Sequence, residues 1–309
     1  MRDTSILQQG VFARVTQQVF TILLVVICFT SCEKSISFDL DASDPKLVVD
    51  ATIESGQPPM VILSRSQDYF SEISPQILAS SFVHNADIRI SNGLVTQTLK
   101  EYAVKTPLNL DVFYYTIDSA NQGQIFLGET GKKYSLAISV DGRQYNSVTS
   151  IPAGGTVIDS IWWRKSPGNP DTNQVILVCK VTDPPGFGNY FRYFTRTGRG
   201  PFLPGLNSVF DDQVVDGTTY TTSVDKGIDR NEKIELEDYA FFNRGDTVTL
   251  KISNIDKSTF DFWRTMEFSY SSIGNPFSTP TKVLGNVSGG ALGYFGGYAV
   301  QSKTLVIPR

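Results

Sequence analysis

The chain has 309 residues, of which 27 are basic and 31 acidic, so its formal net charge is −4. This balance gives no basic surface for nucleic acid, and we expect no nucleic-acid partner. The single histidine excludes zinc sites that need two histidines, and the length favours two domains that each bury a core.

The N-terminal segment has the pattern of a bacterial lipoprotein signal. A basic leader precedes an apolar run, Val19–Phe29, which is too short for the roughly 20 residues that cross a bilayer. Thr30 and Ser31 then precede Cys32, and polar residues follow. We therefore expect cleavage of residues 1–31 and a lipid on Cys32. An ordinary signal peptide and a buried core segment are the alternatives.

The cysteines leave no pair for a disulfide in the mature chain. Cys28 lies in the expected signal peptide and Cys32 would carry the lipid, so only Cys179 remains. Cys179 lies in an apolar, β-branched run, Gln174–Val181, where a cysteine usually acts as a small hydrophobic residue rather than a nucleophile. Residues 32–45 are polar and are interpreted as a tether.

Residues 46–151 contain short runs with alternating or β-branched apolar side chains. Asn92-Gly93 separates two of these runs and Asp141-Gly142 separates two others, which predicts two hairpins. No long helical period lies between the runs, so an immunoglobulin-like β-sandwich domain is expected. The expected strands are Leu47–Ile53, Val61–Ser64, Ala86–Ile90, Leu94–Leu99, Phe113–Ile117, Lys133–Val140 and Gln144–Ile151.

A second domain is expected after Pro152–Gly155, which interrupts the strand pattern. Residues 157–309 are predicted to form another β-sandwich that carries one helix near 256–272, capped by Asp256. Glu267 falls within the apolar face of this helix, which predicts that one edge of that face, a wet edge, is exposed to solvent. The apolar residues of that face are Phe260, Phe262, Trp263, Met266 and Tyr270.

The C-terminal segment 289–298 mixes glycines with Tyr294, Phe295 and Tyr298. Glycine lets a backbone approach another surface closely, and rigid aromatic side chains dominate many interfaces. The three aromatic residues are therefore a candidate contact surface for a sugar, a peptide or a protein. The alternative is a core strand kinked at its glycines.

No catalytic constellation is recognised, so we expect a protein that is not an enzyme and holds no cofactor or metal. His84 lacks an accompanying nucleophile motif and is interpreted as structural. Gly128–Lys133 has neither the spacing nor the Ser or Thr of a phosphate loop. Asp225–Glu232 offers oxygen ligands but lacks the central glycine and final glutamate of an EF-hand, which leaves a metal there as a minor alternative.

The order of several short motifs resembles the lipoproteins grouped as domain of unknown function 4249, typical of Bacteroidota. The resemblance implies a β-rich outer-membrane lipoprotein, often encoded beside a TonB-dependent transporter that it is thought to serve. It brings no catalytic residues to this chain. The motifs are Ser31–Lys34, Lys46–Val49, Gly128-x-x-Gly131-x-x-Tyr134-x-Leu136, Ile151-Pro152, Ile158–Ile161, Asn275–Phe277 and Asn286–Gly290.

These observations predict an accessory or ligand-capturing partner of an outer-membrane β-barrel transporter, held in the outer membrane by the lipid on Cys32 and facing the cell exterior. A structural or adhesive surface module is the alternative. A hydrolase of extracellular polymers is the third hypothesis, with carboxylates that the sequence does not identify. The acidic cluster that often marks surface export is sparse here, since only Glu33 is close to Cys32.

Overall fold

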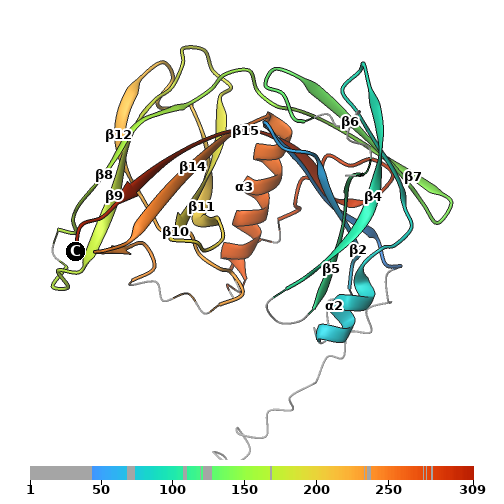
Figure 1. Cartoon of the computed structure of the whole chain (residues 1–309), viewed down its shortest axis with the longest axis horizontal. Helices are drawn as coiled ribbons and strands as arrows, with labels where there is room; N and C mark the ends of the chain where they lie inside the picture. The colour runs from blue at the N-terminus through green and yellow to red at the C-terminus, as the bar shows by residue number, and fades with distance from the viewer. Residues whose placement is uncertain are drawn as a thin grey trace, which may run out of the picture. The chain divides into compact units, whose positions relative to one another are not determined.

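The computed structural model describes residues 44–309 except 68–73, 107–109, 119, 121–126, 168, 233, 235–237, 274, 276 and 280. The predicted signal peptide, Cys32 and most of the tether lie outside these residues. Asp44–Arg309 forms one compact unit that is mostly β, with a large mixed sheet, a smaller sheet and, among the described residues, two helices (Figure 1).

The elements in chain order are β1 (Leu47–Glu54), β2 (Met60–Arg65), α2 (Pro75–Ser81), β3 (Asp87–Ser91), β4 (Thr96–Lys105), β5 (Asp111–Ile117), β6 (Lys133–Val140), β7 (Arg143–Ser150), β8 (Val157–Lys165), β9 (Gln174–Thr182), β10 (Tyr190–Thr197), β11 (Leu203–Asp211), β12 (Thr219–Val224), β13 (Phe242–Asn243), β14 (Thr247–Ile255), α3 (Lys257–Ser272) and β15 (Leu292–Val306). Within the described residues, neither helix combines the length and the hydrophobicity needed to cross a membrane.

The large sheet has the strand order β11-β10-β14-β15-β1-β2-β5-β4-β3-β6-β7. Its strands pair antiparallel except β1 with β15, which are parallel. The sheet curls so that its last strand, β7, comes back to contact β15. The inward faces of β1 to β7 then enclose a first hydrophobic core, whose fully buried members include Leu47, Ile53, Ile88, Leu136 and Phe295.

Both predicted hairpins are confirmed. In the first, Ser91 pairs with Thr96, and Gly93 has a φ of 86°. In the second, Val140 pairs with Arg143 across Asp141 and Gly142, whose φ values are 51° and 71°. Two consecutive positive φ angles are those of a type I′ turn, which matches the twist of the flanking strands and explains why Asp-Gly occurs there.

A second hydrophobic core lies between the two sheets. The smaller sheet is built on β9, which pairs with β8 on one side and with β12 and β13 on the other. Its inner side chains, such as Leu177 and Phe242, pack with Leu250 and Ile252 from β14 of the large sheet. One eleven-stranded sheet contributes to both cores, and Phe295, which follows the predicted boundary at Pro152–Gly155, belongs to the first core.

The predicted helix is confirmed as α3, and Asp256 caps it as expected. The Asp256 carboxylate accepts a hydrogen bond from the Thr259 N–H at 2.9 Å, which satisfies one of the free amides of the first turn. Its other oxygen accepts from the Thr149 hydroxyl and the Ser150 N–H on β7. One side chain therefore starts the helix and fastens it to the end strand of the curled sheet.

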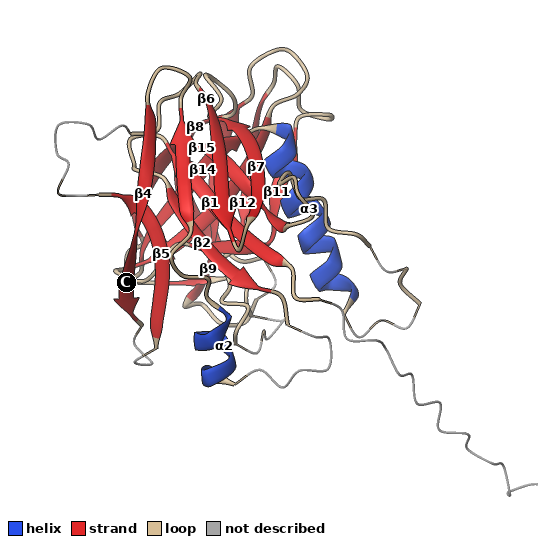
Figure 2. Cartoon of the chain, turned by 90° about the vertical axis from the view of Figure 1, so that its right-hand side faces the viewer, coloured by secondary structure: helices blue, strands red, loops and turns tan. Residues whose placement is uncertain are grey.

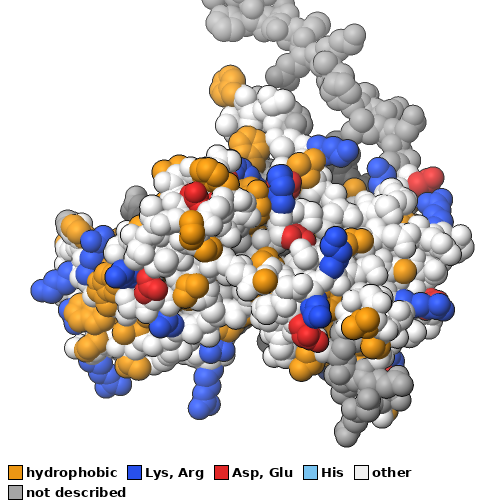
Figure 3. Space-filling view, turned by 90° about the horizontal axis from the view of Figure 1, so that it is seen from above, with side chains coloured by type: hydrophobic (Ala, Val, Ile, Leu, Met, Phe, Trp, Pro, Cys, Tyr) orange, Lys and Arg blue, Asp and Glu red, His pale blue; other side chains and the backbone are white. Residues whose placement is uncertain are grey.

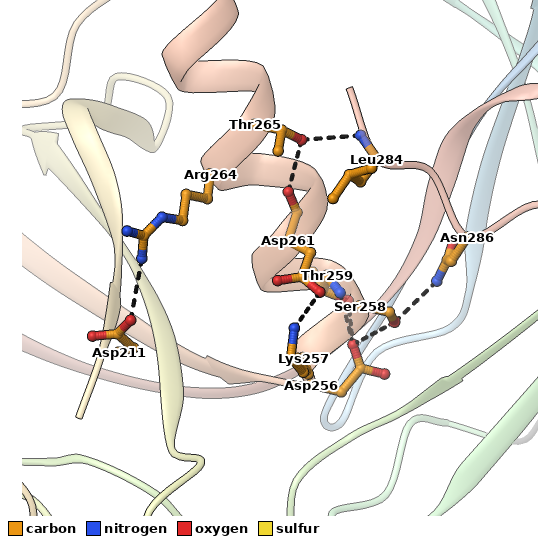
Figure 4. A network of polar contacts seen from close by, with 10 residues as sticks. All are labelled: Asp211, Asp256, Lys257, Ser258, Thr259, Asp261, Arg264, Thr265, Leu284 and Asn286. Atoms are coloured by element: carbon orange, nitrogen blue, oxygen red, sulfur yellow. Dashed lines mark hydrogen bonds and ion pairs between the residues drawn. The ribbon is translucent and has the colours of Figure 1, made fainter. Parts of the chain in front are cut away.

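Further polar contacts hold α3 along its length. Figure 4 shows Arg264 paired with Asp211 of β11, at 3.1 Å, and the Thr265 hydroxyl accepting from the Leu284 N–H at 3.0 Å. Figure 2 shows α3 running beside the strands. The helix contacts β10, β11 and β15, so it covers the part of the large sheet that faces away from the second core.

The prediction of a wet edge at Glu267 is wrong. The residue is buried, and its carboxylate accepts hydrogen bonds from the Ser208 N–H, at 3.0 and 3.1 Å, and from the Ser208 hydroxyl. The Arg230 guanidinium lies 4.0 Å away. A carboxylate can be buried here because β11 offers donors to it. The exposed aromatic residues of the helix are instead Phe268 and Tyr270.

The expected contact surface at Tyr294, Phe295 and Tyr298 is also corrected, because all three side chains are buried, with 4%, 0% and 3% exposure. Successive residues of a strand point to opposite faces. Phe295 therefore enters the first core, while Tyr294 and Tyr298 pack under α3, where the Trp263 indole N–H donates to the Tyr298 hydroxyl at 3.0 Å.

The glycines of this strand serve packing. A Cβ on Gly296 would lie 2.8 Å from the Tyr294 ring, 3.0 Å from the Tyr298 ring and 3.0 Å from Thr259 of α3. A Cβ on Gly293 would lie 1.9 Å from the Val49 carbonyl oxygen, and its φ is 96°. The segment is thus the glycine-kinked core strand that the sequence left as the alternative.

Candidate functional site

A cavity of about 290 Å³ opens between the two sheets at the second core. Buried apolar side chains from β9, β10 and β14 form its floor, and residues of β11 and β12, with Asp225 directly after β12, form its rim. The floor includes Cys179, Val181, Phe191, Tyr193, Leu250 and Ile252, and the rim includes Asn207, Phe210, Tyr220, Thr222 and Asp225.

The opening follows from the sheet topology. β11 is the end strand of the large sheet, and β12 is the end strand of the smaller sheet. Each pairs on one side only, with β10 and with β9, so no ladder of backbone hydrogen bonds closes the gap between them. Side chains of β12 alternate, and those of Tyr220, Thr222 and Val224 line the cavity. The rim is thus made of two strand edges.

The floor of the cavity carries no charge at neutral pH. Burial raises the pKa of the Cys179 thiol to about 11, so the sulfur stays protonated. Burial likewise raises the pKa of Tyr193 on the floor well above its usual value, and it raises the pKa of Tyr220 on the rim to about 12. Among the described lining residues no Lys, Arg or His occurs, which disfavours an anionic ligand.

Asp225 is the one acidic group among the described lining residues. Burial raises the pKa of its carboxyl group, and a hydrogen bond donated by the Tyr239 hydroxyl, at 3.4 Å, works in the opposite direction. An apolar cavity with one carboxyl group at its mouth can hold a small apolar molecule and accept a hydrogen bond from its polar end.

Cys179 and His84, the two residues considered from the sequence as a nucleophile and a base, both lie in the described part of the chain. Cys179 is a neutral thiol in the core strand β9, as the sequence predicted. His84 contacts the Glu101 carboxylate through Nδ1 and lies edge-on to the Phe113 ring, with ring centroids 4.4 Å apart. These contacts tie His84 to the strands β4 and β5, which fits the structural role expected for it.

The remaining sequence candidates have ordinary structural places. Thr130 and Gly131 form a turn directly before β6, so Gly128–Lys133 is not arranged as a phosphate loop. Among the described residues, a different set of acidic residues lies close together. Asp183, Asp212 and Asp216 offer one carboxylate oxygen each within 4.8 Å of one another. Asp225–Glu232, the metal alternative from the sequence, does not form such a group.

Sequence reasoning missed the cavity and the three aspartates. The cavity depends on which strands lie at the edges of the two sheets, and no local sequence pattern predicts that strand order. The aspartates lie in two loops, 183–189 and 212–217. The Pro, Gly and Asp residues of these loops indicate turns, but they do not indicate that the two loops lie next to each other in the fold. Cys32, the predicted lipid anchor, lies outside the described residues.

The sequence matches the model of a known protein family. The family described as Domain of unknown function (DUF4249) matches residues 33–304. No curated protein matches the chain. Because the match covers nearly the whole sequence, as the order of the short motifs indicated, the chain belongs to the DUF4249 family.

Proposed function

We propose that the protein is an outer-membrane lipoprotein, anchored through Cys32 and facing the cell exterior, that captures a small ligand for a TonB-dependent β-barrel transporter. It acts by binding, without catalysis and without a cofactor. The observation that carries the proposal is the apolar cavity of about 290 Å³ between the edges of β11 and β12. Its volume is just below the range of about 300 to 1,000 Å³ that is typical of small-molecule sites.

The cavity favours one chemical class of ligand. Its floor is apolar and uncharged, so most of the ligand surface would be hydrocarbon or aromatic. The carboxyl group of Asp225 at the rim favours a hydroxyl or an amine at the outer end of the ligand. An anionic ligand would lose its hydration without a described cation to replace it.

The proposed anchor supports delivery to a transporter. A lipid on Cys32 would confine the protein to the same two-dimensional layer as a barrel, which raises their effective concentration. A weak interface would then be sufficient for transfer of the ligand. We also infer that each of the two cores belongs to an immunoglobulin-like sandwich module, which would hold the cavity at a distance from the membrane.

The face shown in Figure 3 offers little support for an adhesive module. Figure 3 shows hydrophobic side chains in small groups among polar atoms on one face, with Lys and Arg around them. Scattered exposed apolar residues are normal on protein surfaces, whereas large continuous apolar patches mark interaction sites. The hydrolase hypothesis has no pair of facing carboxylates in the cavity, since Asp225 is the one acid among its described lining residues.

The cavity is tested with a neutral apolar fluorescent probe, N-phenyl-1-naphthylamine. Thr222 faces the cavity from β12, so the substitution Thr222→Trp places a large ring in its mouth. Thr221, the preceding residue, is exposed and does not line the cavity, which makes Thr221→Trp the matched control. The probe should fluoresce with the wild type and with Thr221→Trp but not with Thr222→Trp, and equal fluorescence in all three would refute the site.

The partner is tested separately. The detergent-solubilised, full-length lipoprotein should recover an outer-membrane β-barrel transporter in a pull-down from its own membranes. The Cys32→Ala variant, which cannot be acylated, should recover much less. Recovery of the lipoprotein alone from the wild-type membranes would contradict the transporter partnership, without bearing on the cavity.

A further inference from the structure

Three aspartates from separate turns meet beyond the ends of β9 and β11. Asp183 follows β9, and Asp212 and Asp216 lie in the turn between β11 and β12. One carboxylate oxygen from each lies within 4.8 Å of the other two. None of the three makes an ion pair with a described basic residue, so their negative charge has no protein counter-charge at close range.

One oxygen of Asp183 has no hydrogen-bond donor of normal geometry among the described residues. The residue is 1% exposed, and its Oδ1 accepts a hydrogen bond from the Thr156 hydroxyl at 2.8 Å. Its Oδ2 is buried and accepts no hydrogen bond of normal geometry from any described residue. A buried carboxylate oxygen without a donor is costly, and proteins normally supply a donor, a proton or a cation.

The other two aspartates keep lone pairs available. The Oδ2 of Asp212 accepts from the Gly188 N–H and from both nitrogens of Asn189, whereas its Oδ1 has only a longer contact, 3.1 Å, with the Gly188 N–H. Asp216 uses Oδ1 for the Gly186 N–H, at 2.6 Å. The amides thus orient both carboxylates and leave one oxygen of each largely free for another ligand.

We propose that Asp183, Asp212 and Asp216 bind one calcium ion. Carboxylate oxygens are the ligands of hard cations, and calcium binds them at about 2.3 to 2.6 Å, so two ligands of one ion lie at most about 5 Å apart. The observed limit of 4.8 Å meets that condition. Zinc sites are normally built on Cys and His ligands, which this group lacks, and magnesium requires near-ideal octahedral geometry.

The ion would connect three parts of the second half. Asp183 is fixed to the segment before β8 through Thr156. Asp212 and Asp216 hold the loop after Asp183 through its backbone amides. Binding of the ion would therefore stabilise the turns at the ends of β9 and β11, which belong to the same two sheets that enclose the cavity.

The experiment uses the full-length chain in detergent, freed of metal with a chelator, and calcium chloride as the titrant. Calorimetry should give one site, and the melting temperature should rise by about 3 to 7 °C at roughly 2 mM calcium chloride. Asp183→Asn keeps the Oδ1 acceptor for Thr156 but removes the charge, so it should abolish the shift. Asp216→Asn provides a second, more exposed variant that should do the same.

Asp229→Asn is the matched control, because Asp229 belongs to the other acidic segment and its Oδ1 accepts from the Asn231 N–H at 2.9 Å. This variant should keep the full calcium shift. Absence of heat and of a thermal shift in the wild type would overturn the proposal. A shift that persists in both Asp183→Asn and Asp216→Asn would also overturn it, since the ion would then bind elsewhere.

Discussion

Phe295→Ala is the substitution that most sharply separates a core strand from a contact surface. The Phe295 side chain is fully buried in the first core, where Val287, Ala291 and Ala299 pack against the same cluster. Its removal loses the transfer free energy of a phenyl ring and leaves a cavity, which together cost about 3 to 5 kcal/mol. For a unit of this size the melting temperature should fall by about 6 to 15 °C.

The assay is urea unfolding followed by circular dichroism and by tryptophan fluorescence. The control is Phe277→Ala, whose side chain is 95% exposed and whose loss should change the free energy of unfolding by less than about 0.5 kcal/mol. Coincidence of the two signals would show that both cores unfold together. A Phe295→Ala variant that loses less than about 1 kcal/mol would refute the placement of this strand in the core.

Three further predictions concern two ionisable groups, Glu101 and Cys179. The pKa of Glu101 is lowered, because hydrogen bonds from His84, Asn85 and Tyr115 outweigh its burial. The ionised Glu101 carboxylate therefore stabilises the fold above the pKa of Glu101 in the unfolded chain, and this stabilisation is lost as pH falls through the pKa in the folded chain. Glu101→Gln should lower the free energy of unfolding by about 1 to 2 kcal/mol at pH 7 and by much less in acid. Urea unfolding across pH measures the difference. Cys179 has a raised pKa of about 11, so the native thiol should resist a maleimide at pH 7.5 and react after unfolding, which mass spectrometry of the adduct would show. The same shift means that stability falls as pH rises from about 9 toward 11, since the unfolded thiol ionises first.

Local chemistry explains which parts of the fold could be predicted. Asn92-Gly93 and Asp141-Gly142 fix their hairpins because the turns need positive φ angles, and Asp256 fixes the start of α3 because a carboxylate satisfies free amides. Each of these features depends on residues a few positions apart. The sequence therefore reports them without knowledge of the tertiary structure.

The parts that were missed depend on distant residues. Glu267 is buried because Ser208, 59 positions away, supplies donors to it. The aromatic residues of β15 are buried because α3 covers Tyr294 and Tyr298 on one face, while the curled sheet covers Phe295 on the other. The cavity needs β11 and β12 to be the ends of two sheets, and strand order is not encoded in any one segment.

The most direct test of the account is native mass spectrometry of the lipoprotein purified from its own cells. The wild type should carry the added mass of one small organic molecule, and Thr222→Trp, purified in parallel, should lack it. A wild-type protein whose mass equals that of the acylated polypeptide alone would contradict the claim that the cavity between β11 and β12 captures a ligand.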